Sequence, residues 1–221
     1  METEEEAKET IFKELMFDDS EVRDDYLALF EADTRTFADF MAQAFVRWRS
    51  FNNEVKGDDR KAHVSALVYS AVTLHILSLK LFLSGHTVAA GNLLRQVIES
   101  IALALLCSGK DLDVLVRFME DKYSSTVAVR DVLRHAKKLS LKGDALEALK
   151  NSQEFYHKYS HVTKMTIAIG MSFSEKGELY VGASFDKGKV EAYTREVKGR
   201  VSLAEVFSNF VEGVAANVAK W

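Results

Sequence analysis

The chain has 221 residues, of which 48% are hydrophobic and 28% charged, and its formal net charge at pH 7 is −4. This balance excludes a disordered chain, and the length favours one domain, 1–221, with a single core. Proline is absent, which removes Pro-rich linkers and permits long helices. Cys107 is the only cysteine, so no intramolecular disulfide can form, and without a signal peptide we expect a cytoplasmic protein.

The N-terminal segment is strongly acidic. Residues 1–25 hold eleven acids and three bases, a sum of −8, so the other 196 residues sum to +4. Within it, apolar residues at helical spacing predict a short amphipathic helix over 3–17. We interpret the acidic segment 1–20 as a solvated helix, and partner binding is the alternative.

A second helix is predicted over 21–51, followed by a loop rich in Asn, Gly and Asp. Two nearly all-apolar helices follow, about 60–84 and 88–108, separated at Gly85, which is a typical residue just after a helix end. We expect 60–108 to form an antiparallel helical hairpin at the centre of a bundle. The stretch 67–85 is apolar enough to be tested as a membrane span, but its His and Lys favour a buried bundle helix and no membrane.

In the second half of the chain, the spacing of apolar residues changes from helical to strand-like within one segment. Helices are predicted over 111–141, with a possible break at Ser124-Ser125, and over 145–160. Runs rich in β-branched residues then predict a β-hairpin near 165–184, which should lean on the bundle because two strands alone are marginal. A short helix near 190–197 and a last helix over about 202–220 complete the prediction. The expected fold is mainly α, a single bundle of about six to eight helices with one hairpin.

Two charges interrupt the apolar helix 88–108. Arg95 and Glu99 lie at i and i+4, in the order that stabilises an isolated helix less, so local helix stabilisation does not explain them. One interpretation is a buried ion pair that sets helix register in a structural polar core with Tyr156 and His161. The other is an anion site in which Arg95 meets the anion and Glu99 orients it.

A second polar cluster is predicted on helix 145–160. Glu154, His157 and His161 lie at i, i+3 and i+7 and can share one helix face. Glu-x-x-His is half of a bundle di-metal signature, although no second copy of it is present. A weak metal site is the functional interpretation. His75, on an apolar helix face, is an extra ligand or a core histidine.

A basic stripe is predicted on helix 111–141. Four of its bases follow helical spacing, and between residues 117 and 142 seven bases face three acids. Such a stripe is usually a solvated face, but in an otherwise acidic chain it also suits contacts with phosphates. The four bases are Arg130, Arg134, Lys137 and Lys138.

The segment Arg130-Asp131-Val-Leu-Arg-His135, inside this stripe, resembles the motif of HEPN-type proteins. GNLLRQVIESIALALL, followed later by Tyr156 and Ser160-His161, also looks like uncharacterised bacterial helical proteins near that superfamily. The similarity covers about residues 60–165. HEPN-type proteins are helical bundles of toxin–antitoxin, abortive-infection and RNA-processing systems, and many are metal-independent ribonucleases that act as homodimers.

The resemblance implies RNA as the partner, a homodimer, no cofactor, and Arg130 with His135 as the catalytic pair. A histidine can move the proton of a 2′-hydroxyl, and an arginine can stabilise charge on the phosphate. Five residues rotate helix side chains by about 140°, however, so the two can meet only at a helix end, a kink or a dimer interface. Arg134, Lys137 and Lys138 would then bind phosphate.

Three functions are therefore expected, in this order. The first is a HEPN-like RNA-binding protein or ribonuclease. The second is a non-catalytic interaction or regulatory module with a structural polar core, whose partner docks on the acidic N-terminus or the β-hairpin. The third is a metal-binding helical-bundle enzyme.

Overall fold

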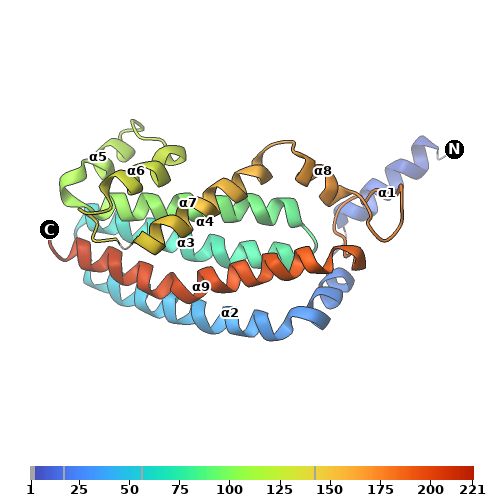
Figure 1. Ribbon diagram of the computed structural model, residues 1–221, viewed down its shortest axis with the longest axis horizontal. Helices are drawn as coiled ribbons and strands as arrows, with labels where there is room; N and C mark the ends of the chain where they lie inside the picture. Colours follow the sequence, from blue (N-terminus) through green and yellow to red (C-terminus); the bar gives the residue numbers. More distant parts are fainter. Residues whose placement is uncertain (1–2, 17, 56, 142) are drawn as a thin grey trace.

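The computed structural model describes residues 3–16, 18–55, 57–141 and 143–221. Four long helices lie side by side and form an elongated bundle, with the two chain ends at opposite tips of the molecule (Figure 1). The mainly α bundle expected from the sequence is confirmed. The long helices are α2 (Ser20–Glu54), α3 (Asp59–Leu83), α4 (Thr87–Ser108) and α9 (Val190–Val218).

The connection between α3 and α4 is short because Gly85 makes the turn. Gly85 has a φ of +81°, a conformation that favours glycine. A Cβ atom there would lie 2.6 Å from the backbone nitrogen of Ser184 and 2.8 Å from Val22, so the close approach also requires glycine. The two helices therefore pack closely against each other along the bundle.

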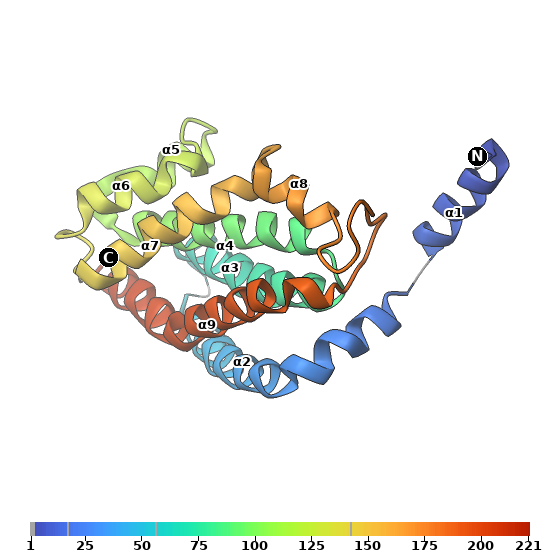
Figure 2. The same ribbon diagram turned by 45° about the vertical axis from the view of Figure 1, so that its right-hand side comes forward.

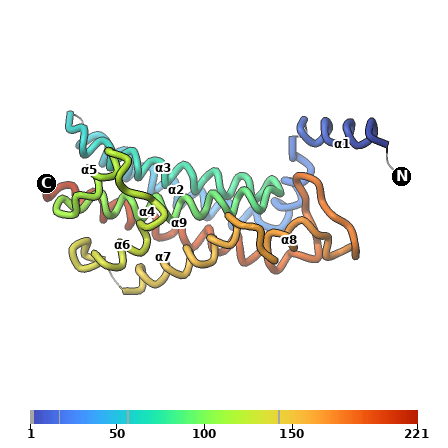
Figure 3. Tube along the Cα trace, turned by 90° about the horizontal axis from the view of Figure 1, so that it is seen from above, coloured from blue at the N-terminus to red at the C-terminus, as the bar shows by residue number. Residues whose placement is uncertain are grey.

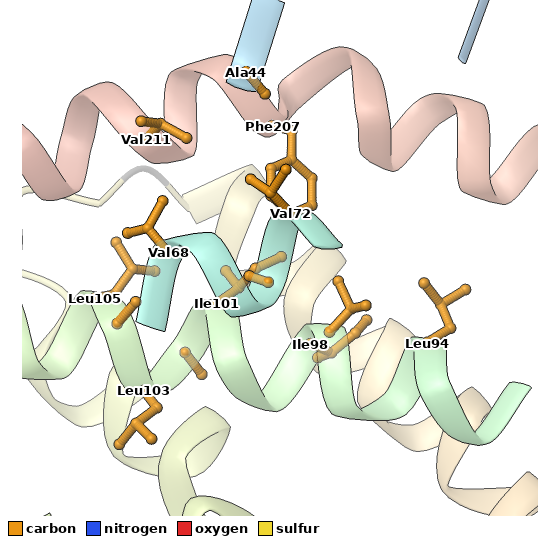
Figure 4. Close-up of a cluster of buried hydrophobic side chains, with 14 of the residues drawn as sticks. Ala44, Val68, Val72, Leu94, Ile98, Ile101, Leu103, Leu105, Phe207 and Val211 are labelled. Atoms are coloured by element: carbon orange, nitrogen blue, oxygen red, sulfur yellow. The ribbon is translucent and has the colours of Figure 1, made fainter. Parts of the chain in front are cut away.

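Helix α4 is the centre of the core. Every residue from Ile101 to Ser108 is buried, so α4 is covered on all sides near its C-terminal end. Figure 4 shows Phe207 and Val211 of α9 and Val68 of α3 on one side of α4, while Leu103 lies on the other side. A helix covered on all sides has no polar face, which explains its nearly continuous apolar sequence.

A second layer of short helices covers the outer side of α4 (Figure 2). The predicted helix 111–141 is divided in the structure, because Asp113 and Asp121 adopt left-handed backbone conformations that end helices. Among the described residues, the additional short helices raise the count above the expected six to eight. The layer consists of α5 (Val114–Met119), α6 (Ala128–His135), α7 (Gly143–Tyr156) and α8 (Lys164–Gly170), with 3₁₀ turns at Lys110–Leu112, Ser125–Val127 and His157–Ser160.

Helix α1 (Glu4–Met16) projects beyond the end of the bundle (Figures 2 and 3). None of its residues is buried. Its described contact with the body is made by Glu14, whose Oε1 accepts a hydrogen bond of 3.1 Å from the backbone nitrogen of Ala183.

The predicted β-hairpin near 165–184 is wrong. Its first half is α8, which begins because the Thr163 and Thr166 side chains cap each other's backbone in a capping box. The chain does reverse at Gly177, as expected, but among the described residues only one antiparallel bridge forms, between Met171 and Leu179. A local cap thus outweighs the β-propensity of the run.

The C-terminal prediction of two helices is also corrected. Val190–Val218 is one helix, although Ser202 and Glu205 have the spacing of a capping box. Val197, Arg200 and Ala204 are all buried, so one inward-facing stripe continues through the expected break. Tertiary burial therefore keeps the helix intact.

By length and composition, two described helices, α3 and α4, are able to cross a membrane. In α4, 72% of the most apolar window is buried inside the bundle, as is typical of a core helix. In α3, only 44% of the corresponding window is buried. The absence of a membrane partner stays a prediction.

Candidate functional site

A cleft of about 450 Å³ lies between the end of α7, α8 and the start of α9, with α3 and α4 beneath it. Its volume falls in the usual range of small-molecule sites, roughly 300–1,000 Å³. Most of the wall is aromatic or aliphatic, and a few polar groups converge on it. The lining residues are Phe82, Thr87, Phe155, Tyr156, Tyr159, Met165, Ala168, Ile169, Phe173, Lys189, Ala192, Tyr193, Arg195 and Glu196.

Glu196 and Arg200 form a buried ion pair in the wall of this cleft. Arg200 is fully buried, and its Nη1 donates to Oε2 of Glu196 at 2.6 Å. Arg200 Nε also donates to Ser78 Oγ at 3.1 Å, and its guanidinium lies 4.7 Å from the Phe82 ring centre. The charge is thus paired with a carboxylate on α9 and hydrogen-bonded to a hydroxyl on α3, which offsets much of the cost of its burial.

Two tyrosines donate further hydrogen bonds to the Glu196 carboxylate. The Tyr159 hydroxyl donates to Oε1 at 2.7 Å, and the Tyr156 hydroxyl donates to Oε2 at 3.3 Å. Burial raises the pKa of both phenols, so they stay protonated donors. Tyr159 reaches this position because residue 91 is glycine: a Cβ there would lie 2.2 Å from its ring.

Lys189 supplies a second charge to the cleft. It is buried, its Nζ donates to the Ile169 carbonyl oxygen at 2.7 Å, and it lies 5.3 Å from the Phe173 ring centre. The Asp186 carboxylate is 3.8 Å from Nζ. That separation is too long for a hydrogen bond. Burial lowers the pKa of Lys189.

Asp186 serves mainly to order the loop before α9. Its carboxylate accepts from the backbone nitrogens of Phe173 and Gly188, at 2.6 and 2.8 Å, and from the Ser174 hydroxyl. Burial alone would raise the pKa of Asp186, but these hydrogen bonds hold it at about 2. Most of its acceptor capacity is therefore used by the loop rather than by Lys189.

His75 lies behind the cleft as a core residue. Its ring stacks on Phe207 at 5.4 Å, and Nε2 is 3.1 Å from the backbone oxygen of Arg200. Burial, together with the nearby Arg200 charge, lowers the pKa of His75 to about 3, so the ring is neutral. Within the described part of the chain, His75 Nδ1 and Arg200 Nη2 are buried without a hydrogen-bond partner.

The four residues of the predicted polar core do not form one cluster in the structure. Arg95 Nε donates to Glu99 Oε1 at 2.9 Å on the surface of α4 that faces the second layer. Tyr156, by contrast, is bonded to Glu196, and His161 is exposed just before α8. Arg95 and Glu99 therefore form an ion pair without the two expected members.

The three predicted metal ligands are only partly brought together. The rings of His157 and His161 lie 4.6 Å apart, whereas Glu154 is exposed and forms an ion pair with Lys150 at 3.8 Å. The described residues contain no group of three or more His, Cys, Asp or Glu side chains arranged to hold a metal ion.

The predicted catalytic pair lies on α6. Arg130 is exposed, and its Nε donates to Asp131 Oδ1 at 3.2 Å. Arg134 donates to the same oxygen at 3.2 Å, so one carboxylate holds both guanidinium groups. His135, the last residue of α6, is half-buried five positions after Arg130, so within one chain the helix turns the two side chains apart.

The four bases of the predicted stripe are exposed, but α6 ends at His135, so only Arg130 and Arg134 lie on this helix. Lys137 and Lys138 follow α6 at the tip of the second layer, opposite the end that carries α1 (Figures 1 and 2). Their exposure leaves them able to contact a phosphate chain.

Sequence reasoning missed Glu196, Arg200 and Lys189. A signal was present for the first two, since Arg200 interrupts the apolar stripe of α9 and Glu196 precedes it by four residues, the favourable order for an ion pair. No signal marks Lys189, because its burial depends on the loop that contains Phe173 and Asp186.

Comparison with known proteins adds no family to this geometry: no family model, no curated protein and no solved structure matches the chain. The HEPN resemblance stays a prediction, and the site has to be judged by its own chemistry.

Proposed function

We propose that the protein is a non-catalytic helical module that binds a small amphipathic organic anion in the α7–α8–α9 cleft. The apolar body of the ligand lies among the aromatic rings, and its acidic group meets Lys189. The observation that carries the proposal is the buried Lys189 ammonium, which lines an aromatic cleft. Its described ion-pair partner, the Asp186 carboxylate, is 3.8 Å away, beyond hydrogen-bond distance.

The charges around the cleft favour an anion over a cation. The Glu196 carboxylate is paired with Arg200 and also accepts hydrogen bonds from two phenols. The Asp186 carboxylate accepts three hydrogen bonds from its own loop and lies 3.8 Å from the Lys189 ammonium, so neither carboxylate is free to receive a cation. Lys189 has three N–H donors, of which one is used by Ile169. A carboxylate or sulfonate would complete the hydrogen bonding of a desolvated ammonium.

The titration of four groups in and around the cleft supports binding rather than catalysis. A general acid or base works best with a pKa near the working pH. The pKa of Asp186 is about 2, the pKa values of Tyr156 and Tyr159 are raised, and the pKa of His75 is about 3. These groups keep one protonation state near neutral pH.

Two probes with the same alkyl chain and head groups of opposite charge test the proposal. Isothermal titration calorimetry with dodecanoate and with dodecyltrimethylammonium, both below micelle-forming concentrations, should give one site for the anion and much weaker binding of the cation. Lys189→Met should weaken dodecanoate binding by about tenfold or more, because a charge-assisted hydrogen bond contributes roughly 1.5–3 kcal/mol.

Two further variants keep this test specific. Lys187→Met removes an exposed charge two residues away and should leave binding unchanged. Ala168→Trp fills the cleft and should abolish binding while thermal unfolding shows an intact fold. Equal affinity for both heads, or dodecanoate binding that survives both Lys189→Met and Ala168→Trp, would contradict the proposal.

RNA binding by the basic stripe is the second candidate, favoured by the exposure of Arg130, Arg134, Lys137 and Lys138 at one tip of the molecule. Fluorescence anisotropy with single-stranded RNA should show binding that weakens with salt. The double variant Lys137→Ala/Lys138→Ala should weaken it, and Lys187→Ala should not. Ribonuclease activity lost in His135→Ala would extend the candidate to a HEPN-like enzyme; no RNA binding by the unmodified chain removes both.

A further inference from the structure

An apolar groove of about 480 Å³ runs between α2 and α3, and it shares no lining residue with the cleft. The walls are formed almost entirely by carbon atoms, including Phe37, Phe45 and the half-exposed Ile76. The only ionisable side chains that line the groove, within the described ranges, are Arg23 and Lys80, and both are basic.

The outer face of α3 is apolar and uncovered around this groove. Although α3 is one of the two most apolar helices described, less than half of its most apolar window is buried. Tyr69, Ile76 and Leu77 are each at least 40% exposed. A soluble protein with a contiguous apolar face usually covers it with a partner.

Helix α1 has the complementary surface. Its large apolar residues are each more than half exposed, and the helix carries five Glu and two Lys, a net charge of −3. The hydrogen bond from the Ala183 backbone nitrogen to Glu14 ties the end of α1 to the body. The rest of α1 extends away from the bundle and does not pack against it (Figure 2). The exposed apolar residues are Ile11, Phe12, Leu15 and Met16.

The α1 helix of the same chain is too short to fill the groove. An α-helix rises by about 1.5 Å per residue. At that rise, Thr34, where the main part of the groove begins on α2, lies about 21 Å from Ser20, and Phe45 lies about 38 Å from it. If α1 folded back along α2, its apolar residues 11–16 would reach only the first turns of α2. The helix that fits the groove must come from another molecule.

We infer that α1 of one chain docks in the α2–α3 groove of a second copy, and that two chains exchange α1 reciprocally to form a homodimer. The apolar stripe of α1 enters the groove as an amphipathic helix, and its glutamates face Arg23 and Lys80 at the rim. The inference is independent of the anion-binding cleft.

Sedimentation velocity on the full chain tests this exchange. The unmodified protein should be a dimer at tens of micromolar, and Leu15→Glu on α1 and Ile76→Glu on the groove should each give a monomer. Both positions are exposed, so the fold should survive, which circular dichroism melting checks. Val206→Glu, an exposed apolar position on α9, is the matched control and should remain a dimer.

Mixing the two monomeric variants makes the test decisive. The Leu15→Glu chain keeps an intact groove and the Ile76→Glu chain keeps an intact α1, so an equimolar mixture should form a heterodimer with one exchanged helix. A monomeric unmodified protein overturns the inference, including one that instead binds phospholipid vesicles. A dimer that survives Leu15→Glu overturns it as well, because direct packing of α3 faces predicts that result. A mixture in which both variants stay monomeric also overturns it, because each variant keeps one intact half of the exchange.

Discussion

Among the described residues, two Arg–Glu ion pairs at i, i+4 are largely buried, in different surroundings. On α4, Arg95 and Glu99 meet at 2.9 Å, and 20% of the Arg95 side chain is exposed to solvent. On α9, Glu196 and Arg200 meet at 2.6 Å, and the Arg200 side chain has no exposure. Only the α9 pair has further side-chain partners from other helices among its described hydrogen bonds, including Ser78 and Tyr159.

This difference shows that sequence spacing identifies a pair but not its role. The α4 pair stands out because it interrupts an apolar helix, yet its described bond is the one within the pair. The α9 pair connects α9 to α3 and to the end of α7, and so shapes a wall of the cleft. Partners contributed by distant segments, rather than the pair itself, separate a local contact from an organising one.

Breaking the α9 pair should have the largest effect. Glu196→Leu leaves a fully buried guanidinium without its carboxylate and removes the acceptor of two phenols, so the free energy of unfolding should fall by about 3–5 kcal/mol. Urea denaturation measures the change. The double variant Glu196→Leu/Arg200→Met should be more stable than the sum of the two single losses predicts, and simple additivity would contradict the coupling.

The pH dependence of stability is a sharper probe of the same surroundings. The folded pKa of His75, about 3, lies below its ordinary 6.5, so below pH 6.5 the unfolded chain binds more protons. Stability should therefore fall as pH decreases from 6.5 towards 3, by up to about 1.4 kcal/mol per unit. Urea midpoints between pH 7 and pH 5, above the range where Asp186 titrates, test this. The slope should be smaller in His75→Gln, and an equal slope would show that other groups cause it.

Breaking the α4 pair should cost less. Arg95→Met leaves Glu99 largely buried and unpaired, but the neighbouring exposure admits water, so a loss of about 1–2 kcal/mol is expected. Dodecanoate binding should be unchanged, because neither residue lines the cleft. A loss of stability equal to that of Glu196→Leu would remove the distinction between the two pairs.

The smallest effect is expected at the surface, where the same spacing occurs without burial. Arg35 and Glu31 on α2 form an i, i+4 pair whose side chains are both mostly exposed. Arg35→Ala should change the free energy of unfolding by about 0.5 kcal/mol or less. Thermal denaturation at low and high salt measures this, and a loss above about 1 kcal/mol would indicate a contact beyond the pair.

The sequence predicted the regular parts of the fold because their causes are local. A continuous apolar pattern and Gly85 were sufficient for α3 and α4. The hairpin near 165–184 failed because β-branched residues follow a threonine that caps a helix, and α9 was divided because a capping-box spacing occurs inside a buried stripe. In the first region a local cap outweighed β-propensity, and in the second the burial of a continuous stripe outweighed a local cap signal.

The cleft could not be predicted in the same way. The bonds that join Glu196 and Arg200 to other segments connect residues 37 to 122 positions apart, and no periodic pattern carries such pairing. Arg200 was visible as a charge in an apolar stripe, but its partners were not. Tyr156 was recognised as polar and buried, and was assigned to the wrong arginine–glutamate pair.

The most direct measurement is a crystal structure of the unmodified protein grown with dodecanoate. We expect the alkyl chain between α7, α8 and α9, with its carboxylate at about 2.7–2.9 Å from Lys189 Nζ. Dodecanoate bound elsewhere, or seated in the cleft with its carboxylate turned away from Lys189, would contradict it.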